Sequence, residues 1–295
     1  MTTLNGVRDM KIAGAPISWG VCEVPGWGHQ MAPERVLQEM CEIGLTATEF
    51  GPQGWLPVEP RARAAEVARY GLIPVGAFFL AVLHDPASDP IPAVERELEA
   101  FEVAGGSYLI LAAHSGSDGY DARPVLDEAG WRTLFDNLDR IGEVCAARGV
   151  TACLHPHWGT MVQNADEIDR VLRNSSVGLC LDTGHITCGG GDPVAIVDEF
   201  ADRVDIVHAK DVRHDLTDKL LTGELTWSEG IRAGMFTPIG RGDIDFAAIV
   251  AKLGAAGFDG YYVLEQDIMI DLEPAPGRGP IDNARASLAA LRALG

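Results

Sequence analysis

The sequence is poor in basic residues and contains no long apolar run. Its 295 residues include 23 Lys and Arg against 43 Asp and Glu, which gives a formal net charge of −20. A surface this acidic repels phosphate backbones and anionic membranes, so we expect neither nucleic acid nor a membrane as a partner. No apolar stretch approaches the roughly 20 residues of a membrane helix, and residues 1–10 show no secretory signal. These absences favour a cytoplasmic protein.

Motifs for disulfide, redox and phosphate chemistry are missing as well. The six cysteines form no Cys-x-x-Cys pair, and Cys145, Cys153 and Cys180 lie within apolar helix or strand patterns, so we expect reduced thiols in the core. No Gly-x-Gly-x-x-Gly follows the first apolar run, and the glycines at 189–191 precede no Lys-Ser or Lys-Thr. The sequence therefore predicts neither a dinucleotide-binding turn nor a phosphate-binding loop.

Short apolar runs alternate with helical patterns along the whole chain. The segments between the runs carry apolar residues at helical spacing, as in Val36, Leu37, Met40 and Ile43. Gly44 and Gly257 come just before two runs, where the end of a helix commonly requires a left-handed residue. The eight runs that we expect to form strands are 11–16, 45–50, 72–79, 108–113, 150–154, 177–181, 204–207 and 261–264.

Eight strand-helix units without a break in composition predict a single closed (β/α)8 barrel, an α/β fold, over residues 1–295. A doubly wound open sheet is the alternative. Residues 211–243 exceed an ordinary strand-helix connection, so we expect a long loop insertion there. Such a loop either covers a site at the barrel mouth or forms a surface excursion or subunit contact.

Histidines and acids stand at the ends of four consecutive expected strands. His155 follows the fifth strand, Asp182 the sixth, His208 the seventh and Glu265 the eighth. The C-terminal ends of the strands of a parallel barrel ring one mouth, so these side chains should converge. One such residue alone is more often satisfied by hydrogen bonds, but four in succession predict a metal centre. Two imidazoles and two carboxylates suit manganese, cobalt, iron or zinc rather than calcium.

Further polar residues surround this group. His185 and Lys210 are candidates either for direct catalysis or for orienting a metal-bound imidazole. Glu49 ends the second expected strand and faces the same mouth, with a salt bridge to a neighbouring strand as the alternative. Trp19 could stack on the apolar face of a substrate ring or cap the core. His114 is expected to line the mouth.

His157 shares the strand parity of His155 and is expected to point to the same mouth. The sequence leaves open which of the two histidines binds the metal. With His155 as the ligand, we expect His157 to contact substrate.

Five motifs carry a resemblance that spans the whole chain. They are APISWG at 15–20, TEFGP at 48–52, HPHWGT at 155–160, DTGH at 182–185 and HAKD at 208–211. Together they resemble the xylose isomerase-like barrel superfamily and, within it, the inosose dehydratases of inositol catabolism. Epimerase and isomerase members carry Glu at the fifth-strand ligand position, where this chain has His155. The His-rich run followed by Gly-Thr is similar to the inosose dehydratase branch.

The resemblance implies a metal-dependent barrel, usually with manganese or cobalt, that acts on polyols or keto-sugars; zinc, iron and magnesium are the alternatives. The implied reaction is dehydration of a cyclic keto-polyol such as 2-keto-myo-inositol through an enolate stabilised by the ion. Lys210 and His185 would form the proton-transfer pair, with Glu265 as a further candidate base. Glu49 would hold substrate hydroxyls.

Other functions are compatible with the same residues. Epimerisation or aldose-ketose isomerisation begins with the same enolate, and a non-catalytic barrel that binds a sugar would need no metal. The phosphodiesterase branch of the superfamily, which repairs abasic DNA, is disfavoured by the net charge of −20. Residues 211–243 and 273–280 are candidates for contacts in a homo-oligomer.

Overall fold

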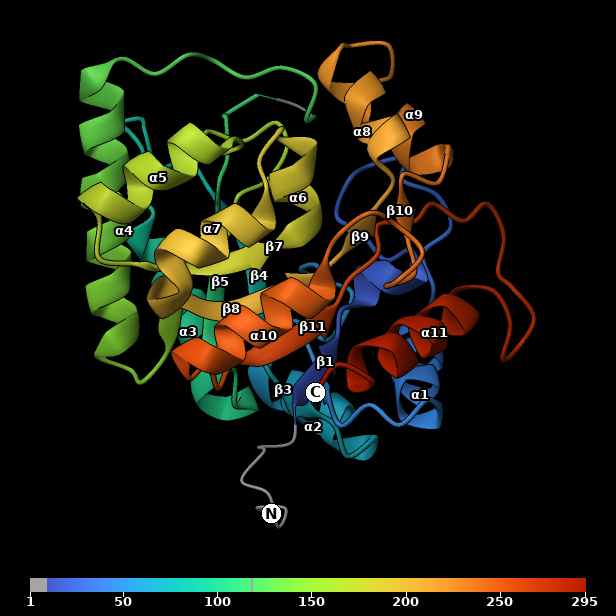
Figure 1. Cartoon of the computed structure of the whole chain (residues 1–295). Coiled ribbons are helices and arrows are strands. Elements are labelled where there is room, and N and C mark those ends of the chain that lie inside the picture. The colour runs from blue at the N-terminus through green and yellow to red at the C-terminus, as the bar shows by residue number, and fades with distance from the viewer. Residues whose placement is uncertain (1–9, 118) are drawn as a thin grey trace.

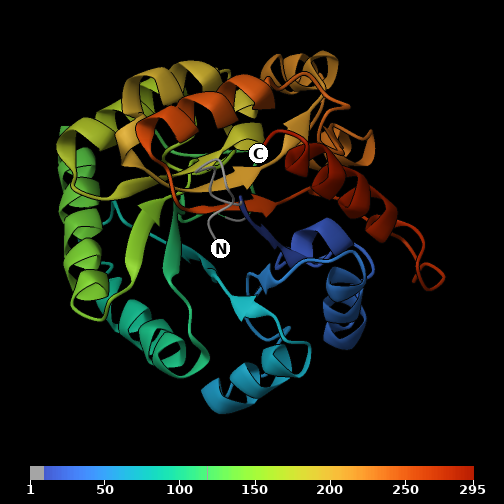
Figure 2. The ribbon, with the colours of Figure 1, turned by 60° about the horizontal axis from the view of Figure 1, so that its bottom comes forward.

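The computed structural model describes residues 10–117 and 119–295 and shows a ring of parallel strands surrounded by helices (Figures 1 and 2). The hydrogen-bonded strand order is β3-β2-β1-β11-β8-β7-β6-β5-β4. The strands of this sheet are β1 (Lys11–Gly14), β2 (Ala47–Thr48), β3 (Ile73–Pro74), β4 (Gly76–Ala81), β5 (Tyr108–Ala113), β6 (Thr151–Leu154), β7 (Gly178–Asp182), β8 (Val204–Ala209) and β11 (Tyr261–Leu264). All eight expected strands are present.

The ring closes through Val75, which separates β3 from β4. The Val75 N–H donates to the carbonyl of Thr48 at 2.8 Å, and its carbonyl accepts the N–H of Tyr108 at 3.0 Å. Residues 73–81 therefore act as one strand between β2 and β5, interrupted next to Pro74, which has no N–H to donate. The prediction of a closed (β/α)8 barrel is confirmed.

Helices cover the outside of the ring and follow the strands in sequence (Figure 2). Several begin with proline in the first turn, where the missing N–H costs no hydrogen bond. The short 3-10 helices are Pro16–Trp19 and Ala201–Arg203. The barrel helices are α1 (Pro33–Glu42), α2 (Pro60–Arg69), α3 (Ile91–Ala104), α4 (Glu128–Ala146), α5 (Ala165–Asn174), α6 (Thr183–Cys188), α7 (Pro193–Phe200), α10 (Phe246–Ala256) and α11 (Pro280–Arg292).

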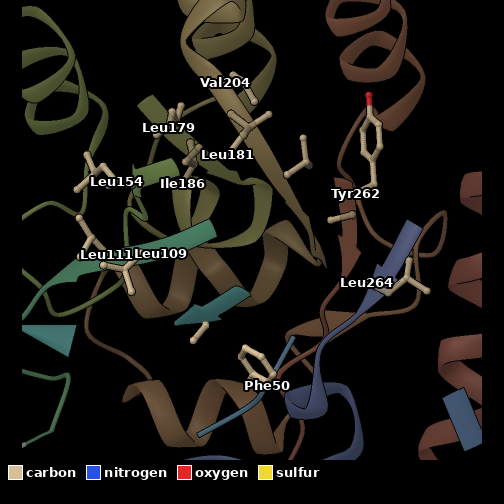
Figure 3. Packing of buried hydrophobic residues seen from close by; sticks show 14 of the residues in the cluster. Phe50, Leu109, Leu111, Leu154, Leu179, Leu181, Ile186, Val204, Tyr262 and Leu264 are labelled. Atoms are coloured by element: carbon tan, nitrogen blue, oxygen red, sulfur yellow. The ribbon is translucent and has the colours of Figure 1, made fainter. Parts of the chain in front are cut away.

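The core has two layers because side chains alternate along each strand. On β5, Leu109 and Leu111 point outward to the helices, whereas Ile110 points into the barrel. The outer layer is the larger one, and Figure 3 shows part of it, including Leu154, Leu181 and Leu264. Each fully buried leucine contributes about 1.5–3 kcal/mol from the removal of apolar surface from water. The residues that fill the barrel are Ala13, Ala15, Ala47, Val75, Ile110, Cys153, Cys180, Ile206 and Val263.

The insertion at 211–243 is folded, so the expectation of a long loop is wrong. It contains β9 (Asp211–Val212), α8 (His214–Leu221), α9 (Trp227–Arg232) and β10 (Phe236–Thr237), with β9 and β10 paired antiparallel. In Figure 1 its helices project beside the mouth, on the side away from the N-terminus. Leu216 with Leu220, and Trp227 with Ile231, have the i, i+4 spacing of one helix face and pack into a small cluster of their own. This spacing was the signal for helices in the sequence.

The Asp211 carboxylate fastens the end of the insertion to its beginning. It accepts four backbone N–H groups, from Val212, Gly240, Gly242 and Ile244, at 2.8–3.1 Å. Asp211 is therefore a structural anchor rather than a group that faces the mouth.

All six cysteines are free thiols, as expected from the sequence. Within the described ranges, no helix combines the length and the apolar character needed to cross a bilayer.

Candidate metal centre and active site

Four side chains from neighbouring strands converge at the mouth of the barrel. Their facing atoms, His155 Nε2, Asp182 Oδ2, His208 Nδ1 and Glu265 Oε2, all lie within 4.8 Å of one another. His155 Nε2 lies 3.2 Å from both Asp182 Oδ2 and His208 Nδ1. Glu265 Oε2 lies 2.8 Å from His208 Nδ1. The structure thus brings together the four residues that the sequence predicts as metal ligands.

Strand periodicity explains this convergence. Every second residue of a strand points into the barrel, and each of the four follows a barrel-filling residue by two positions. Asp182 and His208 are also direct partners in the register of β7 and β8. The preceding barrel-filling residues are Cys153, Cys180, Ile206 and Val263. The four side chains therefore form the uppermost layer of the barrel interior.

The donor atoms fit a divalent metal ion. Two ligands about 2.1 Å from one ion are about 3.0–3.4 Å apart in octahedral or tetrahedral geometry. The closest contacts within the group span 2.8–3.7 Å. Asp182 Oδ2 and Glu265 Oε2 are buried and accept no well-aligned hydrogen bond from any described residue. Lys210 Nζ lies 3.3 and 3.1 Å from these two oxygens, without hydrogen-bond alignment. Both atoms thus have lone pairs available for an ion.

His155, and not His157, belongs to this group in the described part of the chain. Of the alternatives left open by the sequence, the arrangement therefore favours His155 as the ligand. Its Nδ1 is buried without a hydrogen-bond partner among the described residues.

Glu49 holds one imidazole of the group. Its Oε1 accepts a hydrogen bond from His208 Nε2 at 2.8 Å, and both side chains are buried. Because Nε2 must carry the hydrogen, the lone pair of His208 lies on Nδ1, which faces the other three side chains. A carboxylate behind a metal-binding histidine orients the ring and raises its basicity. Glu49 also lines the cavity, as expected, but its contact is the salt-bridge alternative rather than a free carboxylate.

Lys210 lies beside the group and contacts three carboxylates. Its Nζ is 2.8 Å from Asp267 Oδ1, in addition to the contacts with Asp182 and Glu265. Sequence reasoning missed Asp267. It follows Glu265 by two residues and so continues the inward-facing parity of β11, which is the signal that could have identified it.

Acidic side chains outnumber basic ones at this mouth, and their charges together with burial shift the pKa values of the groups in the site. Burial raises the pKa of Asp182, but the charge of Lys210 and the neighbouring histidines together outweigh burial and hold it well below its usual value. Burial likewise opposes ionisation of Glu265, whose pKa His208 and Lys210 lower to about 2. Burial raises the pKa of Asp267 to about 6. For Lys210, burial lowers the pKa, but Asp182 and Asp267 raise it well above the usual value.

The histidines divide into two electrostatic classes. Burial lowers the pKa of His155, brings that of His157 to about 3 and holds that of His185 well below its usual value. His208 is the exception. Burial lowers its pKa, but Cys180 and Glu265 outweigh burial and raise it well above the usual value. The acidic groups around His208 thus favour a positive charge at this position.

A layer of rings lies above the four-residue group. The imidazoles of His157 and His185 have centroids 3.8 Å apart, and the indole of Trp227 lies 5.2 Å from His185 at 23°. Trp227 is 3% exposed and begins α9, so the insertion supplies one wall of the site. The sequence left open whether the insertion covers the mouth or forms a surface excursion or subunit contact. The part around Trp227 lies at the mouth.

The site opens into a cavity of about 600 Å³. Trp19 does not line it. Its ring is fully buried and its Nε1 donates to Glu39 Oε2 at 2.9 Å, so the core alternative is correct and substrate contact is not. His114 is also absent from the lining, and its Nδ1 accepts the N–H of Gly116 at 3.1 Å. The polar residues that line the inner part are Glu49, His155, His157, His185, Lys210, Glu265 and Asp267.

Three residues of the DTGH motif have separate tasks. Asp182 Oδ1 accepts the N–H of His185 at 2.7 Å, which caps α6 and leaves Oδ2 for the metal group. The Thr183 hydroxyl donates to the carbonyl of Lys210 at 2.8 Å and accepts its N–H at 3.0 Å. At Gly184 a Cβ would lie 2.6 Å from Lys210 Cγ, so glycine leaves room for the lysine stem. The motif therefore places both the carboxylate and the ammonium group.

Comparisons with known proteins agree with the fold and the motifs. A model of the xylose isomerase-like TIM barrel family matches residues 37–294. The inosose dehydratase of Geobacillus kaustophilus (strain HTA426) is 34% identical over 279 residues, or 88% of each chain. An L-ribulose 3-epimerase structure has a TM-score of 0.68 at 16% identity over 97% of this chain and 95% of that chain. The IOLI protein with a bound zinc atom has a TM-score of 0.68 at 15% identity, with coverages of 97% and 98%. The chain belongs to the xylose isomerase-like TIM barrel family.

Proposed function

We propose that this protein is a metal-dependent lyase that removes water from a cyclic keto-polyol of the 2-keto-myo-inositol type. The observation that carries the proposal is the convergence of two imidazoles and two carboxylates beside Lys210 at the base of a cavity. The likeness to a named inosose dehydratase over 88% of both chains supports the choice of substrate. A small neutral polyol also agrees with the net charge of −20, which opposes anionic partners.

His155, Asp182, His208 and Glu265 would hold the ion, with Glu49 orienting His208. We propose manganese or cobalt, with zinc, iron and magnesium as alternatives. When bound, such an ion supplies the positive charge that polarises a ketone and stabilises the negative charge left when a neighbouring C–H loses its proton.

Lys210 is assigned as a donor rather than a base. Its contacts with Asp182, Glu265 and Asp267 keep it protonated, so its ammonium can donate hydrogen bonds to substrate oxygens on which charge develops. This revises its expected role as a proton acceptor. Burial keeps the imidazoles of His157 and His185 neutral, and both line the same cavity. Proton transfer to and from the substrate is assigned to these two rings.

The atoms balance as the loss of one water. The carbon next to the ketone gives up its proton, the adjacent carbon loses its hydroxyl, and a donor protonates that hydroxyl as it departs. The enol that remains relaxes to a diketone. Epimerisation on the same site is the second candidate, because it begins with the same proton removal but returns a proton to carbon. A non-catalytic sugar-binding barrel is the third.

The test begins with elemental analysis of the purified protein for a stoichiometric transition metal. The protein is then incubated with 2-keto-myo-inositol and Mn²⁺ or Co²⁺, and products are followed by mass spectrometry and ultraviolet absorbance. The proposal expects a product lighter by one water. A product of unchanged mass would overturn dehydration in favour of epimerisation, and the absence of both metal and turnover would favour the binding protein.

Two variants make the test specific. Asp182→Asn removes one carboxylate of the group and should abolish turnover. Glu39→Gln alters a buried carboxylate that contacts Trp19 outside the cavity and should retain turnover. Equal loss in both variants would count against the assigned site.

A further inference from the structure

We infer that the main chain of Trp158 holds His157 and His185 in opposite tautomers, so that one ring offers a hydrogen-bond acceptor and the other a donor to the same cavity. The tautomers follow from geometry alone. Only their use on a keto-polyol rests on the proposed function. The inference assigns these two rings separate roles as a catalytic pair.

Trp158 accepts a hydrogen bond from one imidazole and donates one to the other. His157 Nδ1 lies 2.7 Å from the carbonyl oxygen of Trp158, which can only accept, so Nδ1 carries the hydrogen of His157. The N–H of Trp158 donates to His185 Nδ1 at 3.3 Å, so the hydrogen of His185 is on Nε2. The remaining nitrogens are therefore a lone pair on His157 Nε2 and an N–H on His185 Nε2.

The surroundings agree with these tautomers. His185 Nε2 lies 3.8 Å from Asp267 Oδ2, an oxygen toward which an N–H is favourable. Both rings line the cavity that contains Lys210 and Glu265.

Trp227 is the positioning residue of this pair. Its ring centroid lies 5.2 Å from that of His185 and 5.9 Å from that of His157, next to the closely spaced, tilted imidazoles of the pair. A 180° flip that exchanges the nitrogens of His185 would have to disturb this packing. The backbone N–H of Trp227 donates to Asp121 Oδ1 at 3.0 Å, which ties the insertion to the loop before α4. The insertion therefore restrains the imidazole through Trp227.

The pair matches neighbouring oxygen-bearing carbons of a keto-polyol. His157 Nε2 takes up the proton released from the substrate carbon. The imidazolium formed on His157 then gives that proton to the departing hydroxyl, to which the His185 Nε2–H donates a hydrogen bond, so the C–O bond breaks with the release of water. Both rings are then neutral again, in their starting tautomers. Exchanging the tautomers would place a donor where a proton must be accepted.

The direct test is long-range ¹H–¹⁵N correlation spectroscopy of the full-length protein labelled at histidine, recorded near pH 7 without substrate. His157→Gln and His185→Gln variants assign the signals. We expect a protonated Nδ1 and a bare Nε2 for His157, and the reverse for His185. The same tautomer in both rings, or two fully protonated rings, would overturn the inference. Because no turnover is required, this result is independent of the proposed function.

Paired variants test the roles of the rings. A glutamine amide reaches about the position of Nε2, whereas an asparagine amide reaches about that of Nδ1. We therefore expect His185→Gln to retain at least tenfold more kcat than His185→Asn, with similar KM. Equal kcat values would contradict the donor role of Nε2.

Trp227→Ala should convert the single tautomer of His185 into a mixture and lower kcat more than KM changes, while Trp227→Phe restores the single tautomer. A merely structural role for Trp227 would lower stability and leave the nitrogen signals unchanged, which would refute the positioning role.

Discussion

Replacing Glu49 should weaken metal binding even though Glu49 is not one of the four converging residues. Its Oε1 accepts a hydrogen bond from His208 Nε2 at 2.8 Å, and Glu49 is only 3% exposed. Hydrogen bonds to charged groups contribute about 1.5–3 kcal/mol. Loss of such a partner behind a metal-binding histidine costs about 10–100-fold in affinity, or about 1.4–2.7 kcal/mol. The two estimates agree.

The size of the effect depends on what replaces the carboxylate. Glu49→Gln keeps an oxygen that can accept from His208 but removes the charge, so we expect about a tenfold loss of affinity. Glu49→Ala leaves the His208 N–H without an acceptor, so we expect about a 100-fold loss. The assay is a competition titration of Mn²⁺ or Co²⁺ against a fluorescent chelator, with bound metal checked by elemental analysis.

The competing hypothesis, in which Glu49 holds substrate hydroxyls, predicts the opposite pattern. KM would then rise while metal affinity stayed within twofold of wild type, and that outcome would refute our reasoning. Glu39→Gln is the matched control. Glu39 is also buried and also accepts hydrogen bonds, from Trp19 Nε1 and Arg35 Nε, but it lies outside the cavity. Its replacement should change stability without changing metal affinity.

Three further predictions address packing, anchoring and protonation. Gly184→Ala places a Cβ 2.6 Å from Lys210 Cγ. We therefore expect the free energy of unfolding, measured by thermal denaturation, to fall by about 1–3 kcal/mol, and kcat to fall because the lysine is displaced. An unchanged kcat would mean that the lysine stem is free to move. Asp211→Asn turns an amide NH2 toward N–H donors of the 240–244 turn, and urea unfolding should show a loss of about 1–3 kcal/mol for each donor left unpaired. His157→Gln tests a pH dependence. The pKa of His157 falls from 6.5 to about 3 on folding. The contribution of neutral His157 to the free energy of unfolding is therefore complete above pH 6.5 and is lost as the pH falls toward 3. Between pH 7 and pH 4 the free energy of unfolding of the metal-free wild type should therefore fall by on the order of 3 kcal/mol more than that of the variant. Urea unfolding that shows the same fall in both proteins would contradict this.

The barrel and most of the metal group were predictable because both follow from local rules. Strand candidates could be identified from short apolar runs, and a two-residue period places a side chain on one face of its strand. Asp182, His208 and Glu265 each required only their own strand to be found and the rule that parallel strands end at one mouth. Asp267 obeys the same rule, because it follows Glu265 on the same face.

Other residues were not predictable, because their roles depend on contacts between distant segments. Trp19 follows the first strand, yet its ring points into the core toward Glu39, 20 residues away. Trp227 lies in a segment that the sequence predicts as a loop, and its ring packs beside His157 and His185. No periodicity within either segment reports where the other segment packs.

The sequence alone therefore determined the alternation of strands and helices in the barrel, the single barrel, and Asp182, His208 and Glu265 as the residues that three strands bring to the mouth. Only the tertiary structure decided that His155 rather than His157 joins the metal group, that Glu49 holds His208, and that Trp227 closes the site. The physical reason is the distance along the chain over which each effect acts. Backbone periodicity acts over a few residues, whereas the distances between side chains on different strands depend on the stagger of the whole barrel and on the packing of the elements around it.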